Sequence, residues 1–242
     1  MLEVDSGARR GGGMNGLTVI IPSKTRSNVD SCVAHVARHE PNAKVLIIDD
    51  GIDWSGERGN ALRNGMRDVR VIPGVKPFIF ARNVNLGIRM AGEDDVVLLN
   101  DDALLQDPGG FSLLQLELER HPGIGMIGAV TNFTGYLEQR KRTIGGQQVG
   151  LRPVQRFAFL CVCIPRRTIN RVGLLDERYT TYGGEDIDYC RQVREAGLQC
   201  AVHDACYVDH GSLNPTFRKS PSAPGDSARG LIIYGQKWGD LR

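Results

Sequence analysis

Short apolar runs alternate with amphipathic segments through the first half of the chain. Four runs rich in valine, isoleucine and leucine predict buried strands: residues 17–22 (LTVIIP), 44–51 (KVLIIDDG), 69–74 (VRVIPG) and 96–100 (VVLLN). The segments 28–40 and 78–92 carry apolar residues at helical spacing. Strands without internal alternation, separated by helices, predict a parallel sheet covered on both faces, with the carboxyl ends of the strands along one edge.

The second half of the chain has a more varied pattern and no internal repeat. It predicts a helix and a short strand over 110–128, polar loops over 131–156, a buried strand and a short helix over 156–173, and a helix at the end of 173–197. Residues 198–212 are again typical of strands.

These patterns predict one α/β domain, because a single continuous sheet runs through both halves. Its predicted parts are a disordered leader over 1–15, a nucleotide-binding half over 16–106, a variable half over 107–212, a mobile segment rich in proline and serine over 213–230, and an apolar, aromatic tail over 231–242 that packs back on the core.

Composition narrows the class of protein without fixing a partner. The 242 residues are 41% hydrophobic and 24% charged, as in ordinary globular proteins, and the net charge of +2 is too small to indicate a polyanionic partner. Two basic clusters, Arg140–Lys141–Arg142 and Arg166–Arg167, are most simply solvated surface. No apolar run approaches the roughly 20 residues of a membrane-spanning helix.

The six cysteines form no C-x-x-C pair, and two of them lie in the apolar run FLCVCIP. This pattern indicates buried free thiols in a reducing compartment rather than disulfides or a zinc site. We therefore expect a cytoplasmic protein.

Two strands of the predicted sheet end on paired carboxylates, Asp49–Asp50 and Asp101–Asp102. Adjacent like charges repel, so such a pair gains nothing for stability unless water or a cation relieves it. Both pairs are expected on the edge where open α/β sheets bind ligands. A ligand or metal site is the interpretation we favour for Asp101–Asp102; a solvated turn remains the alternative, and for Asp49–Asp50 the two are equally good.

The order of these motifs along the chain resembles the glycosyltransferases of family 2, which have the GT-A fold. The resemblance covers residues 17–212 and rests on VIIPSK, LIIDDG, FARNVNLGI, LLNDDALL, GLLDERY, GGEDIDYCRQ and VDHGS in that order; QKWG near the end also resembles bacterial members. It implies a single GT-A type α/β domain, with a Rossmann-like, mostly parallel sheet flanked by helices and a smaller acceptor-binding half. It further implies transfer of a sugar from a nucleoside-diphosphate sugar to an acceptor hydroxyl, with inversion and with Mn²⁺ or Mg²⁺.

The resemblance assigns the metal site to the end of the fourth predicted strand. Asp102 matches the metal-binding position of the D-x-D motif, and Asp101 the neighbour that faces the donor ribose. Asn100 stands where many members have aspartate, so the site depends more on Asp102. His210, in VDHGS, matches a position that supplies an imidazole near the metal and the diphosphate.

Four further residues are assigned to the donor nucleotide on the same basis. Asp50 matches the contact to the donor base or ribose, and Pro22 and Ser23 would line that pocket through their backbone. Arg82 stands where an arginine approaches the base or the diphosphate; pairing with a surface acid is the alternative.

An inverting transfer also needs a group that takes the proton of the attacking hydroxyl. The family pattern favours Asp186 as this base, with Glu185 orienting the acceptor. Successive helical side chains point about 100° apart, so only one of the two can face the reacting centre well. The alternative is that both acids merely stabilise the helix dipole.

The acceptor is the least determined part. A glycan or other saccharide is the first expectation, with a protein, a small metabolite or a modified nucleic-acid base as alternatives, and the oligomeric state is not indicated. Residues 213–230, with Arg218 or Lys219, are a candidate lid over the diphosphate. The rival functions are a non-catalytic nucleotide-sugar-binding module and a sugar nucleotidyltransferase; the loop IPSKTRSNVD lacks the glycines that the latter needs for a triphosphate.

Overall fold

The computed structural model describes residues 15–54, 66, 68–144, 147–148, 150–180, 183–215 and 223–239. The predicted leader, apart from Asn15, lies outside the described residues, as do Arg218 and Lys219 of the candidate lid.

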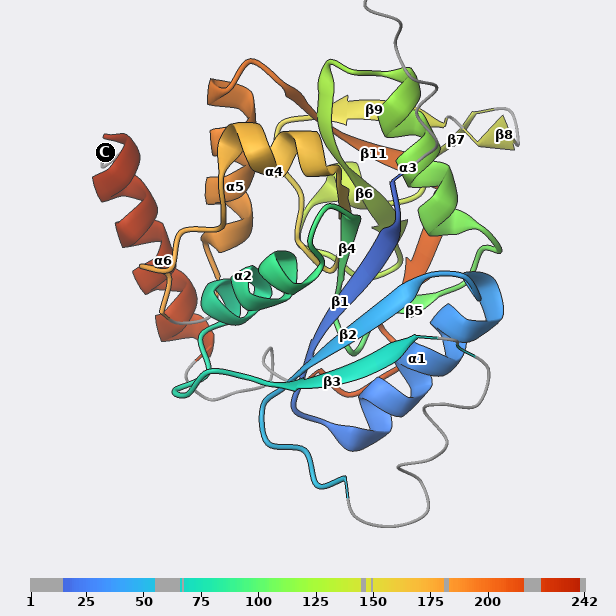
Figure 1. The fold of residues 1–242 in the computed structure, drawn as a ribbon. Helices are drawn as coiled ribbons and strands as arrows, with labels where there is room; N and C mark the ends of the chain where they lie inside the picture. The colour runs from blue at the N-terminus through green and yellow to red at the C-terminus, as the bar shows by residue number, and fades with distance from the viewer. Residues whose placement is uncertain are drawn as a thin grey trace, which may run out of the picture.

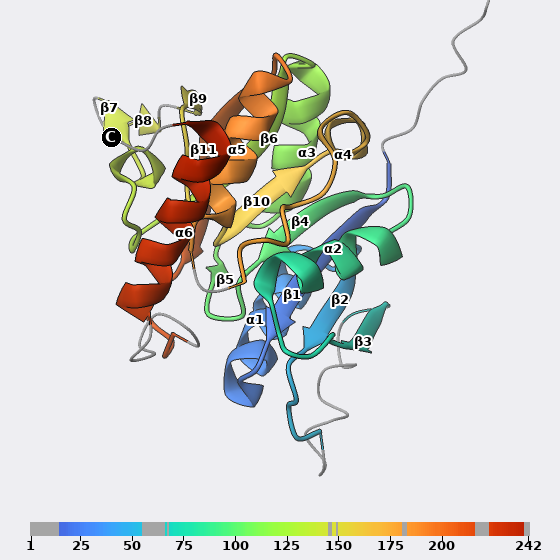
Figure 2. The same cartoon turned by 90° about the vertical axis from the view of Figure 1, so that its left-hand side faces the viewer.

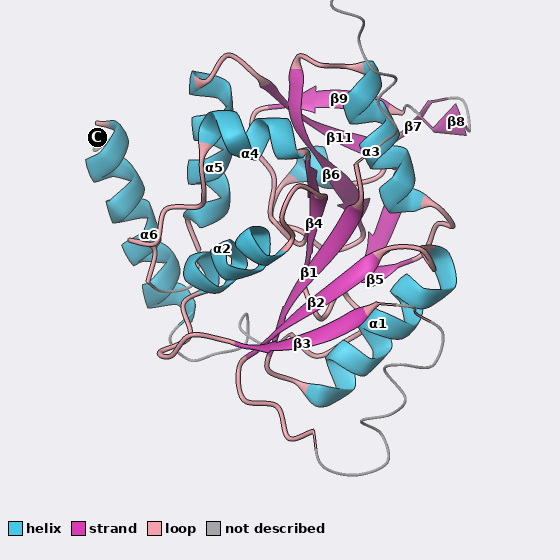
Figure 3. Cartoon of the chain, in the orientation of Figure 1, coloured by secondary structure: helices cyan, strands magenta, loops and turns pink. Residues whose placement is uncertain are grey.

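A nine-stranded mixed sheet runs through the molecule (Figures 1 and 3). Its strands lie in the order β3-β2-β1-β4-β10-β6-β11-β5, and β9 pairs with β11. They are β1 (Leu17–Ser23), β2 (Lys44–Asp49), β3 (Val69–Pro73), β4 (Asp95–Leu99), β5 (Leu104–Leu105), β6 (Ile124–Thr131), β9 (Leu151–Val154), β10 (Cys161–Ile164) and β11 (Gln199–Asp209). A separate two-stranded pair is formed by β7 (Thr143–Ile144) and β8 (Gln147–Gln148).

The strand directions bring several carboxyl ends to one edge. Strands β1 to β4 are parallel, as predicted. Strand β10 is antiparallel to both β4 and β6, and β11 is parallel to β6. Two reversals restore the direction, so β11 ends at the same edge as β4. The fold class predicted from the sequence is thus confirmed.

Helices cover both faces of the sheet. The helices are α1 (Arg26–His39), α2 (Phe80–Met90), α3 (Gly110–Arg120), α4 (Arg166–Val172), α5 (Glu185–Glu195) and α6 (Ala223–Trp238), with a short 3-10 turn, η2 (Leu137–Gln139). One core forms between α1, α3 and one face of the sheet, and a second forms under α2, α4 and α5. Helix α6 lies beside α5, away from the sheet (Figures 1 and 2).

The sequence pattern was wrong in two places. The segment 131–156, predicted as loops, contains η2, β7, β8 and β9, and β9 extends the sheet through β11. Within the predicted mobile segment 213–230, helix α6 already begins at Ala223, while 216–222 lie outside the described residues. Both elements depend on tertiary pairing and packing rather than on local propensity, which explains why the pattern missed them.

All six cysteines are buried free thiols, as predicted. One of the two basic clusters differs in part from the prediction, because Arg166 is buried and donates to the Ile88 carbonyl. Arg167 is exposed, as predicted, and it also donates to the Leu118 carbonyl, so both side chains tie α4 to other elements. No helix in the described ranges is long and apolar enough to cross a lipid bilayer.

Candidate active site

The carboxyl ends of β1, β2 and β4 are joined by hydrogen bonds. The Ser23 hydroxyl donates to Oδ2 of Asp101 at 2.7 Å, and the backbone N–H of Asp50 donates to the Ser23 carbonyl at 2.8 Å. Asp101 and Asp102 are both buried in the turn after β4. The charges of these two carboxylates act on Cys32, where burial is the larger cause and their charge the smaller cause of a raised thiol pKa.

His210, directly after β11, faces Asp102. Its Nε2 lies 3.2 Å from Oδ1 of Asp102, and its Nδ1 lies 2.9 Å from the Phe133 carbonyl oxygen. A carbonyl oxygen only accepts, so Nδ1 carries the proton of that hydrogen bond. In the neutral ring, Nε2 therefore presents its lone pair toward the carboxylate.

The turn that carries His210 is fixed by its neighbours. The His210 N–H donates to Oδ1 of Asn132, whose side-chain amide donates to Asp209. Asp209 also accepts from the N–H groups of Gly211 and Ser212 and from the Ser212 hydroxyl. Burial pushes the pKa of Asp209 upward, but these hydrogen bonds outweigh it and hold the pKa at about 2. The ionised Asp209 carboxylate thus stabilises the turn that carries His210.

The other predicted carboxylate pair divides its roles. Asp49 accepts from the N–H groups of Gly51 and Ile52 and from the Trp54 indole, so its carboxylate shapes the loop after β2. Asp50 forms an ion pair with Lys76. Pro22 is buried inside β1, in register with Ile48, so of the first-strand pair only Ser23 offers a polar side chain to the edge.

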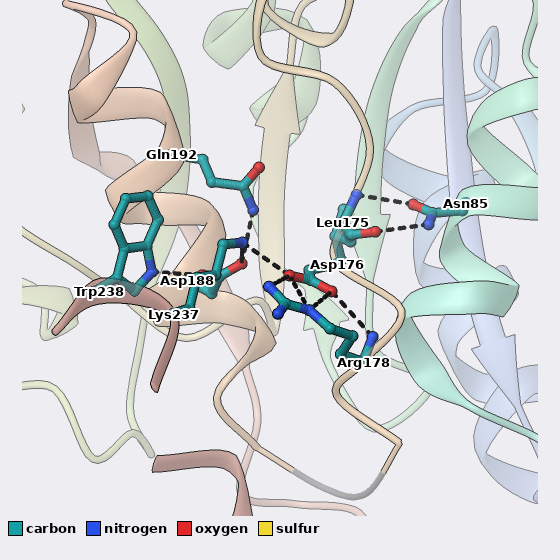
Figure 4. A network of polar contacts seen from close by, with 8 residues as sticks. All are labelled: Asn85, Leu175, Asp176, Arg178, Asp188, Gln192, Lys237 and Trp238. Atoms are coloured by element: carbon teal, nitrogen blue, oxygen red, sulfur yellow. Dashed lines mark hydrogen bonds and ion pairs between the residues drawn. The ribbon is translucent and has the colours of Figure 1, made fainter. Parts of the chain in front are cut away.

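Arg82 lies on α2 and is paired with an acid, as the alternative interpretation anticipated. Its Nε is 3.6 Å from Oε2 of Glu177. The same glutamate accepts from Asn85, which also exchanges hydrogen bonds with the backbone of Leu175 (Figure 4). These contacts tie α2 to the loop before α5.

Glu185 and Asp186 begin α5 after two glycines. Gly183 and Gly184 have φ of 96° and 100°, a region that glycine alone adopts without strain. The first turn of α5 lies near the loop after β6, because the charge of Asp186 acts on Tyr136 in that loop. Burial, and after it the charge of Asp186, raises the pKa of Glu185. Burial also raises the pKa of Asp186, but by less, because a hydrogen bond from the Ile187 N–H stabilises the Asp186 carboxylate and lowers its pKa.

The loop after β6 connects the His210 side of the site with Asp186, and the sequence pattern did not single it out. The Phe133 ring lies 6.4 Å from the His210 ring, and Tyr136, three residues on, lies near Asp186, whose charge adds to burial in raising the Tyr136 pKa. Phe133 and Leu137 are 53% and 65% exposed, and Arg156 lies over the Tyr136 ring. Two aromatic residues in the polar stretch NFTGYLEQR were the available signal for a binding loop.

Asp102 and His210 fit a divalent cation whose remaining ligands come from a phosphate and water. Among the described residues there is no group of three or more His, Cys, Asp or Glu that could hold a metal by itself. Magnesium-type sites, however, often use one or two protein ligands and complete the shell with substrate phosphates and water. Adjacent ligands of an octahedral ion with bonds of about 2.1 Å lie roughly 3.0 Å apart, close to the 3.2 Å between Oδ1 of Asp102 and Nε2 of His210.

Comparison with solved structures places this fold among GT-A enzymes. The chain resembles the structure described as "Crystal structure of GalNAc-T7 with UDP, GalNAc and Mn2+" with a TM-score of 0.72 at 14% identity, over 94% of this chain and 49% of that chain. A curated relative, "Uncharacterized protein y4gI" of Sinorhizobium fredii (strain NBRC 101917 / NGR234), is 25% identical over 213 residues, which cover 75% of this chain and 23% of that protein. The chain therefore spans less than half of either relative.

The family is shown by a direct match to the sequence. Residues 18–177, more than half of the chain, match the family described as Glycosyl transferase family 2. The chain therefore belongs to glycosyl transferase family 2. The matched span includes Asp101 and Asp102 and ends before Glu185, Asp186 and His210, so the roles of these last three are argued from geometry.

The titration of Asp209 gives a test of the turn that holds His210. A carboxylate with a lowered pKa in the folded state stabilises that state above its unfolded pKa, and this contribution is lost as the pH falls. Between pH 4 and about pH 2, the wild type should therefore lose more thermal stability than Asp209→Asn, which keeps an acceptor oxygen but cannot titrate. Thermal unfolding monitored at both pH values measures this, and equal losses in the two proteins would refute the role of Asp209.

Proposed function

We propose that the protein is a glycosyltransferase that uses a divalent cation and inverts the transferred sugar, moving it from a nucleoside-diphosphate donor to an acceptor hydroxyl. The observation that carries the proposal is the approach of Asp102 to His210 at the edge where β1, β2 and β4 end. Ligands bind at this edge in open α/β sheets, and Asp186 begins α5 near the loop that follows β6.

In this proposal, Asp102 and His210 hold Mn²⁺ or Mg²⁺. The cation would neutralise the charge of the departing nucleoside diphosphate. The relative GalNAc-T7 was crystallised with UDP, GalNAc and Mn²⁺, which supports a similar donor chemistry here. His210 is suited to the role because the Phe133 carbonyl fixes its tautomer and Asn132 fixes its backbone.

The donor nucleotide would lie along the ends of β1 and β2. Ser23 restrains the Asp101 carboxylate, which we propose faces the ribose, and Asp50 and the backbone of Pro22 border the same edge. Arg82 is the predicted contact to the base or diphosphate. Its ion pair of 3.6 Å with Glu177 is long and partly exposed, so an anionic donor can compete for the guanidinium.

Asp186 is proposed as the general base and Glu185 as the group that orients the acceptor. Burial pushes both pKa values up, and that of Glu185 further, so near neutral pH Asp186 is ionised while Glu185 keeps its proton. An ionised carboxylate accepts the hydroxyl proton, and a protonated one donates a hydrogen bond. The buried Oε2 of Glu185 has no hydrogen-bond partner in the described part of the protein, which suits a group that awaits a ligand.

The acceptor is proposed to be a saccharide that rests on Phe133 and Leu137. These exposed apolar side chains lie on the loop that joins the His210 side of the site to the Asp186 side. An aromatic face suits the apolar C–H face of a sugar ring. A protein or a modified nucleic-acid base are the other acceptor classes, and free thiols at all six cysteines support a reducing, cytoplasmic setting.

Removing the Asp102 carboxylate should abolish the metal dependence of donor binding. After a thermal-shift screen selects the best nucleotide sugar, calorimetry with Mn²⁺ and with chelator should give a wild-type affinity ratio of about tenfold or more, whereas Asp102→Ala should bind equally weakly in both. Asp30→Ala, which breaks a surface pair on α1, serves as the control and should behave as wild type. Metal-dependent affinity that persists in Asp102→Ala contradicts the assignment.

Asp186→Asn should lose transfer by about 10²–10⁴-fold while it still binds donor with Mn²⁺, because the amide cannot take a proton. In the wild type, kcat should fall below about pH 6, since burial raises the pKa of Asp186 to about 6 and protonation removes the base. Normal turnover by the variant places the base elsewhere. A wild type that binds donor and never turns it over is a binding module.

Phe133→Ala should raise the acceptor KM about five- to tenfold, a loss of roughly 1–1.4 kcal/mol for a ring face uncovered on one side. Hydrolysis of the donor without acceptor should be unchanged. The matched control is Leu231→Ala, which trims a similarly exposed apolar residue on α6. An unchanged acceptor KM for every saccharide tested would remove Phe133 from the acceptor site.

A further inference from the structure

Helix α6 touches the turn that presents Glu185 and Asp186. A Cβ atom built on Gly230 of α6 would lie 2.0 Å from the carbonyl oxygen of Gly183 and 3.4 Å from Cα of Gly184. No side chain fits in that space, so the helix backbone rests directly on the backbone of the turn. Ser227, one turn earlier in α6, is the next neighbour, since a Cβ on Gly183 would meet its Oγ at 3.4 Å.

The turn is held from its other side by an aromatic ring. A Cβ on Gly184 would lie 2.8 Å from the Tyr179 ring and 3.1 Å from the Gly230 carbonyl carbon. Gly183–Gly184 is thus enclosed between Tyr179 and α6. Two successive glycines have more conformational freedom than any other pair, so their own backbone preferences do not define one geometry. The packing around them must do so.

The far end of α6 is fastened to the same helix that carries the carboxylates. Lys237 donates to Asp188 at 2.8 Å and to Asp176 at 2.9 Å, and the Trp238 indole donates to Asp188 at 2.7 Å (Figure 4). Asp188 is completely buried and lies two residues after Asp186. The Arg191 guanidinium, one turn further along α5, lies 4.6 Å over the Trp238 ring.

These contacts come from one face of α6. The contacting residues recur every three or four positions along the helix: Ser227, Gly230, Tyr234, Lys237 and Trp238. Helix α6 therefore meets the glycine turn at one end of its contact face and the buried Asp188 carboxylate of α5 at the other.

We propose that α6 is a positioning element for the proposed catalytic turn, with Gly230 and the Lys237–Trp238 pair as its positioning residues. The proposal rests on the proposed function of Asp186. A general base acts only within hydrogen-bond reach of the hydroxyl, and a displacement of about 1 Å costs on the order of 10²-fold in rate. Helix α6 positions Glu185 and Asp186, whereas the positions of Asp102 and His210 depend on β4 and β11.

The test compares two alanine substitutions in the same helix. Gly230→Ala places a methyl group against the turn, while Gly225→Ala places one where no described atom lies within 4 Å. Both changes replace glycine with alanine, the better helix former. Gly230→Ala should lower kcat for transfer at least about tenfold, with donor affinity in Mn²⁺ kept within about twofold, and Gly225→Ala should match the wild type. Equal kcat in the two variants overturns the proposal.

A second variant and two further measurements keep the outcome clear. Trp238→Phe keeps an aromatic ring and removes the hydrogen bond to Asp188, so it should also lower kcat without affecting donor affinity. An unchanged kcat would mean that the contact between Trp238 and Asp188 does not position the turn. The acid limb of the kcat profile should move to lower pH in Gly230→Ala, because a displaced helix lets water reach Asp186.

Hydrogen exchange separates this proposal from the function on which it rests. The amides of residues 184–188 should exchange faster in Gly230→Ala than in Gly225→Ala, with β4 unchanged. If the wild type turns over no donor, the proposed function fails, yet the exchange comparison still decides whether α6 holds the turn. Equal exchange in both variants would overturn the proposal that α6 positions the turn, whatever the activity.

Discussion

Negative charge buried at the end of β4 is the constraint on which the site depends. Asp101 and Asp102 follow Asn100 in the turn after β4, and both side chains are buried away from water that would screen them. The Ser23 hydroxyl satisfies one oxygen of Asp101, and the His210 ring faces Asp102. Adjacent buried carboxylates are costly unless positive charge is close, which is consistent with the cation and phosphate proposed for this place.

The remaining parts of the site are brought to that edge by topology. Strand β11 reaches it because two antiparallel pairings restore the direction of β4. The loop after β6 joins His210 to the start of α5, with Phe133 near His210 and Tyr136 near Asp186. The proposed donor and acceptor sites are supported by different neighbours: Asn132 and Asp209 on one side, Tyr179 and α6 on the other.

Much of this organisation could be predicted from the sequence, and the exceptions have physical causes. Strands β1, β2 and β4 are nearly continuous apolar runs, so their position and the acidic pairs after β2 and β4 follow from local pattern alone. Strand β9 and helix α6 were missed because β9 exists only through pairing with β11, and α6 carries Ser227 and Gly230 where the pattern of an ordinary helix would have larger residues. Asp49 and Asp50 look alike in sequence, but only the fold shows that Asp49 organises its own loop while Asp50 pairs with Lys76.

The central claim is that Asp102 and His210 together bind a divalent cation at the end of β4. Crystals grown with Mn²⁺ and a nucleoside diphosphate, measured at a wavelength where manganese scatters anomalously, test this most directly. The account predicts one anomalous peak at about 2.0–2.3 Å from Oδ1 of Asp102 and Nε2 of His210, with the diphosphate oxygens completing the shell. A peak bound elsewhere, or a diphosphate bound away from the end of β4 with no manganese at this pair, would contradict it.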